Sequence, residues 1–219
     1  MQTIKARKIL RRLIFNTPLK NRITFGYPLN LTVPQLCLVC QFVEKVRNTK
    51  GAVAEVGVER GITTVFINKY MDAQKIEKKY YAIDTFSGFC PEDIRQENPS
   101  LRRFYENHHF QVSTKKWFDY TMNFNGIKRV VSIETDVNKF DLAKLGVLSF
   151  VFLDVDLYRP TKKALQELYD ALAPEGIIVV HDCDPKVVAW KGAYEAYTEF
   201  MDEINKPVEI INSLGIVRK

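Results

Sequence analysis

Apolar and polar positions follow two recurring patterns from about residue 34 onward. Short apolar, β-branched runs that end in glycine or an acidic residue predict buried strands. Between them, segments with apolar residues three or four positions apart predict amphipathic helices. Five alternations of this kind favour a mostly parallel sheet. The expected strands are residues 51–57, 79–84, 130–133, 148–154 and 176–180, and the expected helices are residues 34–47, 61–72, 140–145, 160–173 and 190–204.

The C-terminal residues predict a β-hairpin. Residues 208–212 and 216–218 are mainly apolar, and they flank Ser213-Leu-Gly215, which suits a tight turn. This hairpin adds antiparallel strands at one edge of the sheet. The predicted fold class is therefore α/β: a Rossmann-like, mostly parallel seven-stranded sheet with helices on both faces and an antiparallel C-terminal hairpin.

One long segment, residues 86–125, interrupts the alternation. It is rich in aromatic and charged residues, with helical stretches near residues 101–110 and 114–122. We expect this insertion to form a lid over the ligand site, where it could stack on a sugar ring or pair with a phosphate. A helical segment with a small core of its own is the alternative.

Length and composition fit one globular domain over residues 35–219. The 219 residues are 46% hydrophobic and 26% charged, which is typical of a soluble protein. No apolar run reaches the ~18–20 residues that span a bilayer. The start of the chain also lacks the apolar core of a signal peptide. We therefore expect the protein in the cytoplasm.

Residues 1–34 form a basic segment, with seven basic residues before the first acidic one. Apolar residues interleave with them at roughly helical spacing, so a helix is predicted here. The segment could lie on the inner face of an anionic membrane, act as an oligomerisation arm, or simply face water. The basic residues are Lys5, Arg7, Lys8, Arg11, Arg12, Lys20 and Arg22.

The first two strands predict a nucleoside site, because ligands of parallel α/β sheets bind beyond the carboxyl ends of the strands. Glu55, Gly57 and Gly61 form a glycine turn whose spacing differs from the G-x-G-x-x-G of a pyrophosphate-binding turn. Asp84 ends the second strand, where a carboxylate suits two ribose hydroxyls. The glycine turn and Asp84 together predict a site for the ribose of adenosine, but they do not distinguish NAD from S-adenosylmethionine. The alternative is that the glycines serve only to form a tight turn.

The polar residues that follow the fourth and fifth strands indicate which reaction the site could catalyse. Asp154 and Asp156 follow the fourth strand, and residues two apart in an extended segment point the same way. His181 and Asp182 follow the neighbouring fifth strand. Such a group could bind a divalent cation, which lowers the pKa of a bound hydroxyl so that a carboxylate can accept its proton. Alternatively, Asp182 caps a helix and Asp154 accepts backbone N–H groups.

Four motifs resemble the macrocin O-methyltransferase family in order and spacing, from about residue 35 to the end. Members are class I enzymes that methylate sugar hydroxyls with S-adenosylmethionine and magnesium. The run Asp-x-Asp-Leu-Tyr-x-x-Thr is the most specific motif, and the glycine turn is the least. The motifs are Glu55-Val-Gly57, Ala82-Ile-Asp-Thr-Phe-Ser-Gly88, Leu153-Asp-Val-Asp-Leu-Tyr-Arg-Pro-Thr161 and Val179-Val-His-Asp182.

For the cofactor, the resemblance implies a role at each matched position. Glu55, Gly57 and Gly61 match the turn that binds S-adenosylmethionine. Asp84 matches the ribose-binding acid, and Ser87 lies in the segment that covers the cofactor.

For the chemistry, the resemblance makes Asp154 and Asp182 metal ligands and Asp156 the general base. His181 stands where the family usually has a second aspartate. It therefore removes one negative charge from the metal site, although imidazole can still bind a transition metal. Val155 replaces a usual glycine, which changes the turn's backbone slightly.

The sequence thus predicts an S-adenosylmethionine-dependent O-methyltransferase acting on a hydroxyl of a sugar or glycoside, assisted by Mg²⁺ or another divalent cation. The expected partner is a small-molecule or glycan acceptor and not a nucleic acid. Three alternatives remain: a metal-independent O-methyltransferase with Asp156 or His181 as base, an NAD-dependent dehydrogenase, and a non-catalytic adaptor that binds membrane. The missing pyrophosphate turn speaks against the dehydrogenase, and the carboxylate set speaks against the adaptor.

Overall fold

The computed structural model describes residues 13–14, 17–19, 29–107 and 109–219. The chain divides into two units, Met1–Asn30 and Leu31–Lys219, and the second is the domain described below. Most of the predicted basic N-terminal segment lies outside the described residues, so its proposed roles stay predictions. None of the described helices is both long and apolar enough to cross a bilayer.

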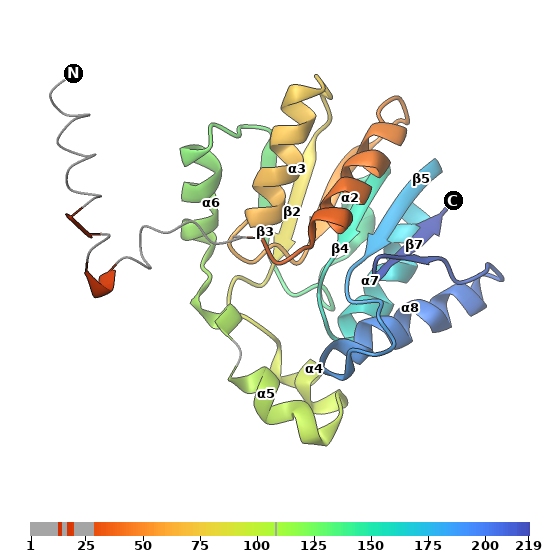
Figure 1. Ribbon diagram of the computed structural model, residues 1–219. Helices are drawn as coiled ribbons and strands as arrows, with labels where there is room; N and C mark the ends of the chain where they lie inside the picture. The colour runs from red at the N-terminus through yellow and green to blue at the C-terminus, as the bar shows by residue number, and fades with distance from the viewer. Residues whose placement is uncertain (1–12, 15–16, 20–28, 108) are drawn as a thin grey trace, which may run out of the picture. The chain divides into compact units, whose positions relative to one another are not determined.

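A seven-stranded sheet forms the centre of the domain, in the order β3-β2-β1-β4-β5-β7-β6 (Figure 1). Strands β1 to β5 are parallel, and β7 runs antiparallel between β5 and β6. The predicted fold class is confirmed. The strands are β1 (Ala52–Val56), β2 (Tyr80–Asp84), β3 (Val130–Glu134), β4 (Leu148–Leu153), β5 (Leu172–Val180), β6 (Ile210–Ile211) and β7 (Leu214–Arg218).

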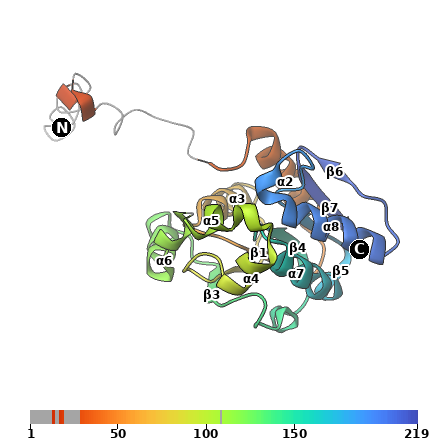
Figure 2. The same ribbon diagram turned by 90° about the horizontal axis from the view of Figure 1, so that it is seen from below.

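Helices cover both faces of this sheet (Figures 1 and 2). On one face, α6 packs against the turn that leads into α3, and α2 lies beside α3. On the other face, α7 and α8 pack against each other and against the sheet. These helices are α2 (Val33–Lys45), α3 (Ile62–Ala73), α6 (Lys115–Phe124), α7 (Tyr158–Ala171) and α8 (Lys191–Glu203).

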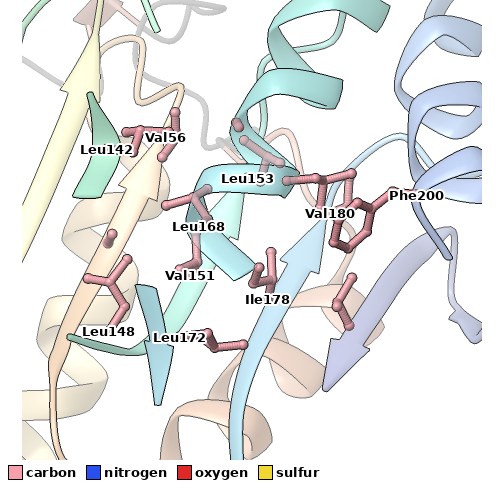
Figure 3. Close-up of a cluster of buried hydrophobic side chains, with 14 of the residues drawn as sticks. Val56, Leu142, Leu148, Val151, Leu153, Leu168, Leu172, Ile178, Val180 and Phe200 are labelled. Atoms are coloured by element: carbon pink, nitrogen blue, oxygen red, sulfur yellow. The ribbon is translucent and has the colours of Figure 1, made fainter. Parts of the chain in front are cut away.

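The largest core lies between the central strands and the α7–α8 pair. All six residues of β4 are buried, as expected for a parallel strand covered on both faces. Alternate strand residues reach the same side, where the apolar stripe of α7 and Phe200 of α8 meet them (Figure 3). This layer includes Val56, Val151, Leu153, Leu165, Leu168, Ile178 and Val180.

The junction between α7 and β5 differs from the prediction. The chain leaves the helix at Ala171, and Leu172 already pairs with Leu148 of β4. The ladder then breaks around Pro174, which has no N–H to donate, and resumes where Ile177 pairs with Phe150. Residues 174–176, which the prediction left between the helix and the strand, therefore form an irregularity inside β5.

The C-terminal hairpin is confirmed, but its turn lies earlier than predicted. Ile211 pairs with Leu214, so the loop contains only Asn212 and Ser213. Both residues have left-handed backbone, with φ of 52° and 62°. Two-residue hairpin loops need this conformation because it matches the twist of the strands, and Asn adopts it readily.

The insertion between β2 and β3 is helical, as predicted. Ile94 and Tyr105 of its first half pack with Leu157, the residue before α7, so this apolar cluster joins the insertion to the main domain. That this segment forms a lid over the ligand site stays a prediction. Its elements are α4 (Pro91–Gln96), η2 (Pro99–Leu101), α5 (Arg102–Glu106), η3 (His109–Val112) and α6.

Candidate active site

The turn between β1 and α3 has left-handed backbone at Gly57 (φ 85°) and Gly61 (φ 82°). A Cβ added to Gly57 would lie 1.8 Å from the carbonyl oxygen of Asp154, at the end of β4. A Cβ added to Gly61 would lie 2.8 Å from the ring of Phe118 in α6. Both glycines are therefore required by the packing of the turn itself, apart from any ligand.

Asp84 ends β2 and binds this same turn. Its Oδ2 accepts hydrogen bonds from the backbone N–H groups of Val58 (2.8 Å) and Glu59 (2.9 Å), and its Oδ1 accepts one from Phe86 (2.7 Å). The nearby Thr85 hydroxyl is 3.4 Å from the same Oδ1, but it donates over the shorter distance of 2.7 Å to the carbonyl of Gly88. Because a carboxylate oxygen has two acceptor positions, Oδ1 can still accept from a ribose hydroxyl. That contact stays a prediction.

Glu55 lies beneath the turn and is only 1% exposed. Its Oε2 accepts hydrogen bonds of 2.6 Å from the hydroxyls of Thr64 in α3 and Tyr80 in β2. Burial raises the pKa of Glu55 to about 8, although both hydroxyl donors act in the opposite direction. Ser87 is exposed on the segment after β2. Cofactor contacts of Glu55 and Ser87 stay predictions.

Asp154, His181 and Asp182 lie together at the ends of β4 and β5. The Nδ1 atom of His181 is 2.9 Å from Oδ1 of Asp154 and 3.2 Å from Oδ2 of Asp182. Consecutive residues in a strand point to opposite faces. Asp182 has left-handed backbone (φ 57°), which allows both His181 and Asp182 to face Asp154.

Asp156 joins this cluster from the other side of the β4 turn, where it too has left-handed backbone (φ 63°). Its burial, and then the negative charges of Asp154 and Asp182, raise its pKa well above the usual range. For His181, burial lowers the pKa, but the carboxylates of Asp154 and Asp182 outweigh it and leave the pKa well above normal. The cluster is thus crowded with negative charge, which a proton or a cation relieves.

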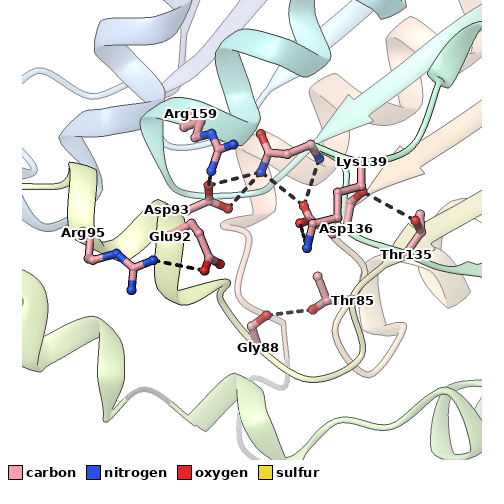
Figure 4. Close-up of polar contacts among 10 residues, drawn as sticks. Thr85, Gly88, Glu92, Asp93, Arg95, Thr135, Asp136, Lys139 and Arg159 are labelled. Atoms are coloured by element: carbon pink, nitrogen blue, oxygen red, sulfur yellow. Dashed lines mark hydrogen bonds and ion pairs between the residues drawn. The ribbon is translucent and has the colours of Figure 1, made fainter.

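A second group of potential metal ligands, Cys90, Asp93 and Asp136, lies between the insertion and the end of β3. Its carboxylates already have protein partners (Figure 4). Asp93 accepts hydrogen bonds from Arg159 (3.1 Å) and Asn138 (3.0 Å), and Asp136 accepts one from the backbone of Asn138 (2.9 Å). These contacts connect α4 to α7 and to the loop after β3.

Glu97, just after α4, provides another connection. It is 8% exposed, and its Oε1 accepts a hydrogen bond of 2.7 Å from the backbone N–H of Tyr158, the first residue of α7. Because Tyr158 follows Asp156 by two residues, Glu97 fixes the backbone next to the expected base. Sequence reasoning missed Asp93 and Glu97 because neither follows a strand, and acidic residues in short helices are common.

Aromatic side chains of the insertion surround Trp190, which precedes α8. Their ring centroids lie between 5.2 and 6.5 Å apart. Tyr105 and Trp190 pack with Leu157, the residue after Asp156, so this aromatic cluster adjoins the carboxylates. Burial, followed by the charges of Glu97 and Asp156, raises the pKa of Tyr105 to about 12. The cluster consists of Phe89, Phe104, Tyr105, Phe110 and Trp190.

Several solved structures with a similar fold are described as methyltransferases. The O-methyltransferase NovP superposes with a TM-score of 0.76 at 18% identity, covering 89% of this chain and 83% of its own. The calicheamicin methyltransferase CalS11 gives 0.64 at 20% identity, covering 99% and 92%. A putative methyltransferase from Streptococcus mutans, in complex with SAH, gives 0.55 at 14% identity, covering 86% and 99%. The chain therefore has a methyltransferase fold.

The family follows from the sequence match. The model of the family described as Macrocin-O-methyltransferase (TylF) matches residues 35–219. The chain belongs to this O-methyltransferase family, as the four motifs predicted. No curated protein matches the sequence.

Proposed function

We propose that this protein transfers a methyl group from S-adenosylmethionine to a sugar hydroxyl, with Asp156 as general base and a divalent cation bound by Asp154, His181 and Asp182. The observation that carries the proposal is the convergence of these four side chains at the ends of β4 and β5. They lie beside the glycine turn, since Gly57 contacts the backbone of Asp154.

For the cofactor, the support is the β1–α3 turn together with Asp84. The turn is closed by hydrogen bonds to Asp84, which still has an acceptor position for ribose. The similarly folded Streptococcus mutans protein was solved in complex with SAH. S-adenosylmethionine supplies an electrophilic methyl group, which this chain has to hold in line with the acceptor oxygen.

For the reaction, the difficulty is the acceptor. A sugar hydroxyl is a poor nucleophile until it loses its proton. Asp156 has the position and the half-buried surroundings to accept that proton. A divalent cation, when bound, lowers the pKa of a hydroxyl that coordinates it and neutralises the carboxylates around Asp156.

The donor set fits such a cation. Two carboxylates and one imidazole offer ligand atoms that all lie within 4.8 Å of one another. Neighbouring ligands of an octahedral ion with bonds of about 2.1 Å are roughly 3 Å apart. The 2.9 Å and 3.2 Å distances from His181 to its two carboxylates match this spacing.

For the acceptor, the support is the aromatic cluster next to Asp156 and the relatives. CalS11 is described as a TDP-rhamnose 3′-O-methyltransferase. Aromatic rings such as those of Phe104 and Trp190 can pack on the apolar face of a sugar.

A metal-independent O-methyltransferase is the second candidate, and one observation favours it. His181 lies between two carboxylates that raise its pKa, so a protonated imidazole could supply the positive charge that a cation would bring. In that case Asp156 acts as the base without metal, because a protonated imidazole cannot accept a further proton.

Calorimetry and a transfer assay test the proposal. The protein is titrated with S-adenosylmethionine and, separately, with NAD, and binding is expected only for the former. Methyl transfer is then followed on a panel of glycosides and nucleotide sugars, with and without EDTA. A heat of binding for NAD and none for S-adenosylmethionine would refute the methyltransferase function. Full activity in EDTA would favour the metal-independent candidate.

A further inference from the structure

We propose that His181 makes this centre selective for divalent transition metals such as Mn²⁺, Fe²⁺ and Co²⁺ over Mg²⁺. The inference rests on the proposed function, because it concerns the cation of the same site. It goes further in assigning the metal preference to one residue of this chain.

The first step is the position of the imidazole. Nδ1 of His181 is the atom that faces Asp154 and Asp182, at 2.9 Å and 3.2 Å. His181 is the residue directly after β5, so the end of this buried strand fixes the backbone from which the imidazole extends. Any ion held by the two carboxylates therefore has a ring nitrogen within reach.

The second step is the chemistry of the donors. Mg²⁺ prefers oxygen ligands and gains most from their negative charge. A neutral imidazole contributes no charge, and nitrogen donors favour transition metals instead. With His181 in the set, the protein offers two anionic oxygens and one nitrogen, a combination that suits Mn²⁺, Fe²⁺ or Co²⁺ better than Mg²⁺.

The third step is that the rest of the cluster cannot replace the lost charge. Asp156, the remaining carboxylate, is needed as proton acceptor. The other metal-capable group of the described residues, Cys90, Asp93 and Asp136, is a separate cluster whose carboxylates pair with Arg159 and Asn138. The preference at the ends of β4 and β5 is therefore set by His181.

Direct binding measurements test this without any assay of activity. The full-length protein, freed of metal with EDTA and dialysed, is titrated with Mn²⁺, Co²⁺ and Mg²⁺ in a calorimeter. We expect Mn²⁺ and Co²⁺ to bind about tenfold or more tightly than Mg²⁺. His181→Asp is expected to reduce that ratio by about tenfold, mainly by improving Mg²⁺ binding.

Pulsed electron paramagnetic resonance of the Mn²⁺-loaded protein gives a second readout, which reports directly on the atoms bound to the metal. A coupling to ¹⁴N is expected in the unmodified protein and is expected to vanish in His181→Asp. Cys90→Ala is the matched control, because it removes one of the three potential ligands of the other cluster and should change neither result.

Equal affinities for Mg²⁺ and Mn²⁺, a ratio unchanged in His181→Asp, or no ¹⁴N coupling would each overturn the inference. No metal binding at all would also overturn it and would favour a protonated His181 in place of the cation. Titration of the same samples with S-adenosylmethionine distinguishes failure of the metal inference from failure of the proposed methyltransferase function. Binding of S-adenosylmethionine without metal would leave the methyltransferase proposal standing, whereas its absence would remove that proposal itself.

Discussion

The carbonyl oxygen of Asp154 lies 1.8 Å from the point that a Cβ on Gly57 would occupy. These residues follow neighbouring strands, and the N–H of Asp154 donates to the carbonyl of Val56 at 2.8 Å. The turn expected to bind the cofactor and the cluster expected to bind the cation therefore share a backbone contact. We therefore expect a displacement of the glycine turn to displace the cluster around Asp154 as well.

Gly57→Ala should consequently damage both stability and cofactor binding. The new methyl group meets backbone, which cannot rotate away, so we expect a loss of about 3 kcal/mol or more in the free energy of unfolding. Gly126→Ala is the matched control, because Gly126 also has left-handed backbone (φ 69°) but no atom within 4 Å of the added Cβ. That control should cost only about 1–2 kcal/mol. Denaturant unfolding measures both variants, and equal losses would show that the contact with Asp154 is unimportant.

Asp156→Asn should abolish proton acceptance while leaving the cofactor site intact. Asparagine tolerates the left-handed backbone found at this position, so the fold should be retained. We expect turnover to fall by about 10²–10⁴-fold, the usual contribution of a general base. Calorimetry should give an unchanged affinity for S-adenosylmethionine. A variant with normal turnover would mean that another group, such as His181, is the base.

The fold was largely predictable because its signals are local. Apart from Ser149, the run from Leu148 to Leu153 is apolar on both faces, as suits a central strand, and polar residues follow it at once. The α7–β5 junction was less predictable. Pro174 and Gly176 end the helical pattern of residues 160–173 in the sequence. That β5 starts before them, however, follows only from the pairing of Leu172 with Leu148.

The site was predictable to the extent that it follows strand ends. Asp154, His181 and Asp182 meet as expected, because neighbouring parallel strands end at the same edge. The engagement of Asp84 with the turn, and the burial of Glu55, could not be derived, since both depend on where hydrogen-bond donors lie in three dimensions. Sequence spacing carries no such information.

Glu97→Ala should loosen the insertion from the start of α7. The variant removes the acceptor for the N–H of Tyr158 and leaves a buried gap, which should cost about 1–2 kcal/mol. With the backbone beside Asp156 less fixed, we expect kcat/KM for the acceptor to fall about tenfold or more. Proteolysis within residues 98–112 should become faster.

Glu92→Ala is the control for this prediction. Glu92 belongs to α4, the short helix that Glu97 follows, but it is exposed and only forms a surface ion pair with Arg95. It should leave both the kinetics and the cleavage rate almost unchanged. Equal behaviour of the two variants would mean that Glu97 does not position the site.

Glu55→Gln should change how stability depends on pH. The pKa of Glu55 rises from 4.5 to about 8 on burial, so the folded state favours the protonated carboxyl. The stability from this group is therefore complete below its unfolded pKa near 4.5 and is lost as the pH rises through about 8. Glutamine keeps a carbonyl acceptor for Thr64 and Tyr80 but cannot ionise. Relative to the unmodified protein, the variant should gain about 1 kcal/mol or more between pH 5 and pH 9. Urea unfolding at both pH values measures this, with Glu77→Gln at an exposed site as control, and parallel pH profiles for Glu55→Gln and the unmodified protein would rule out a protonated Glu55.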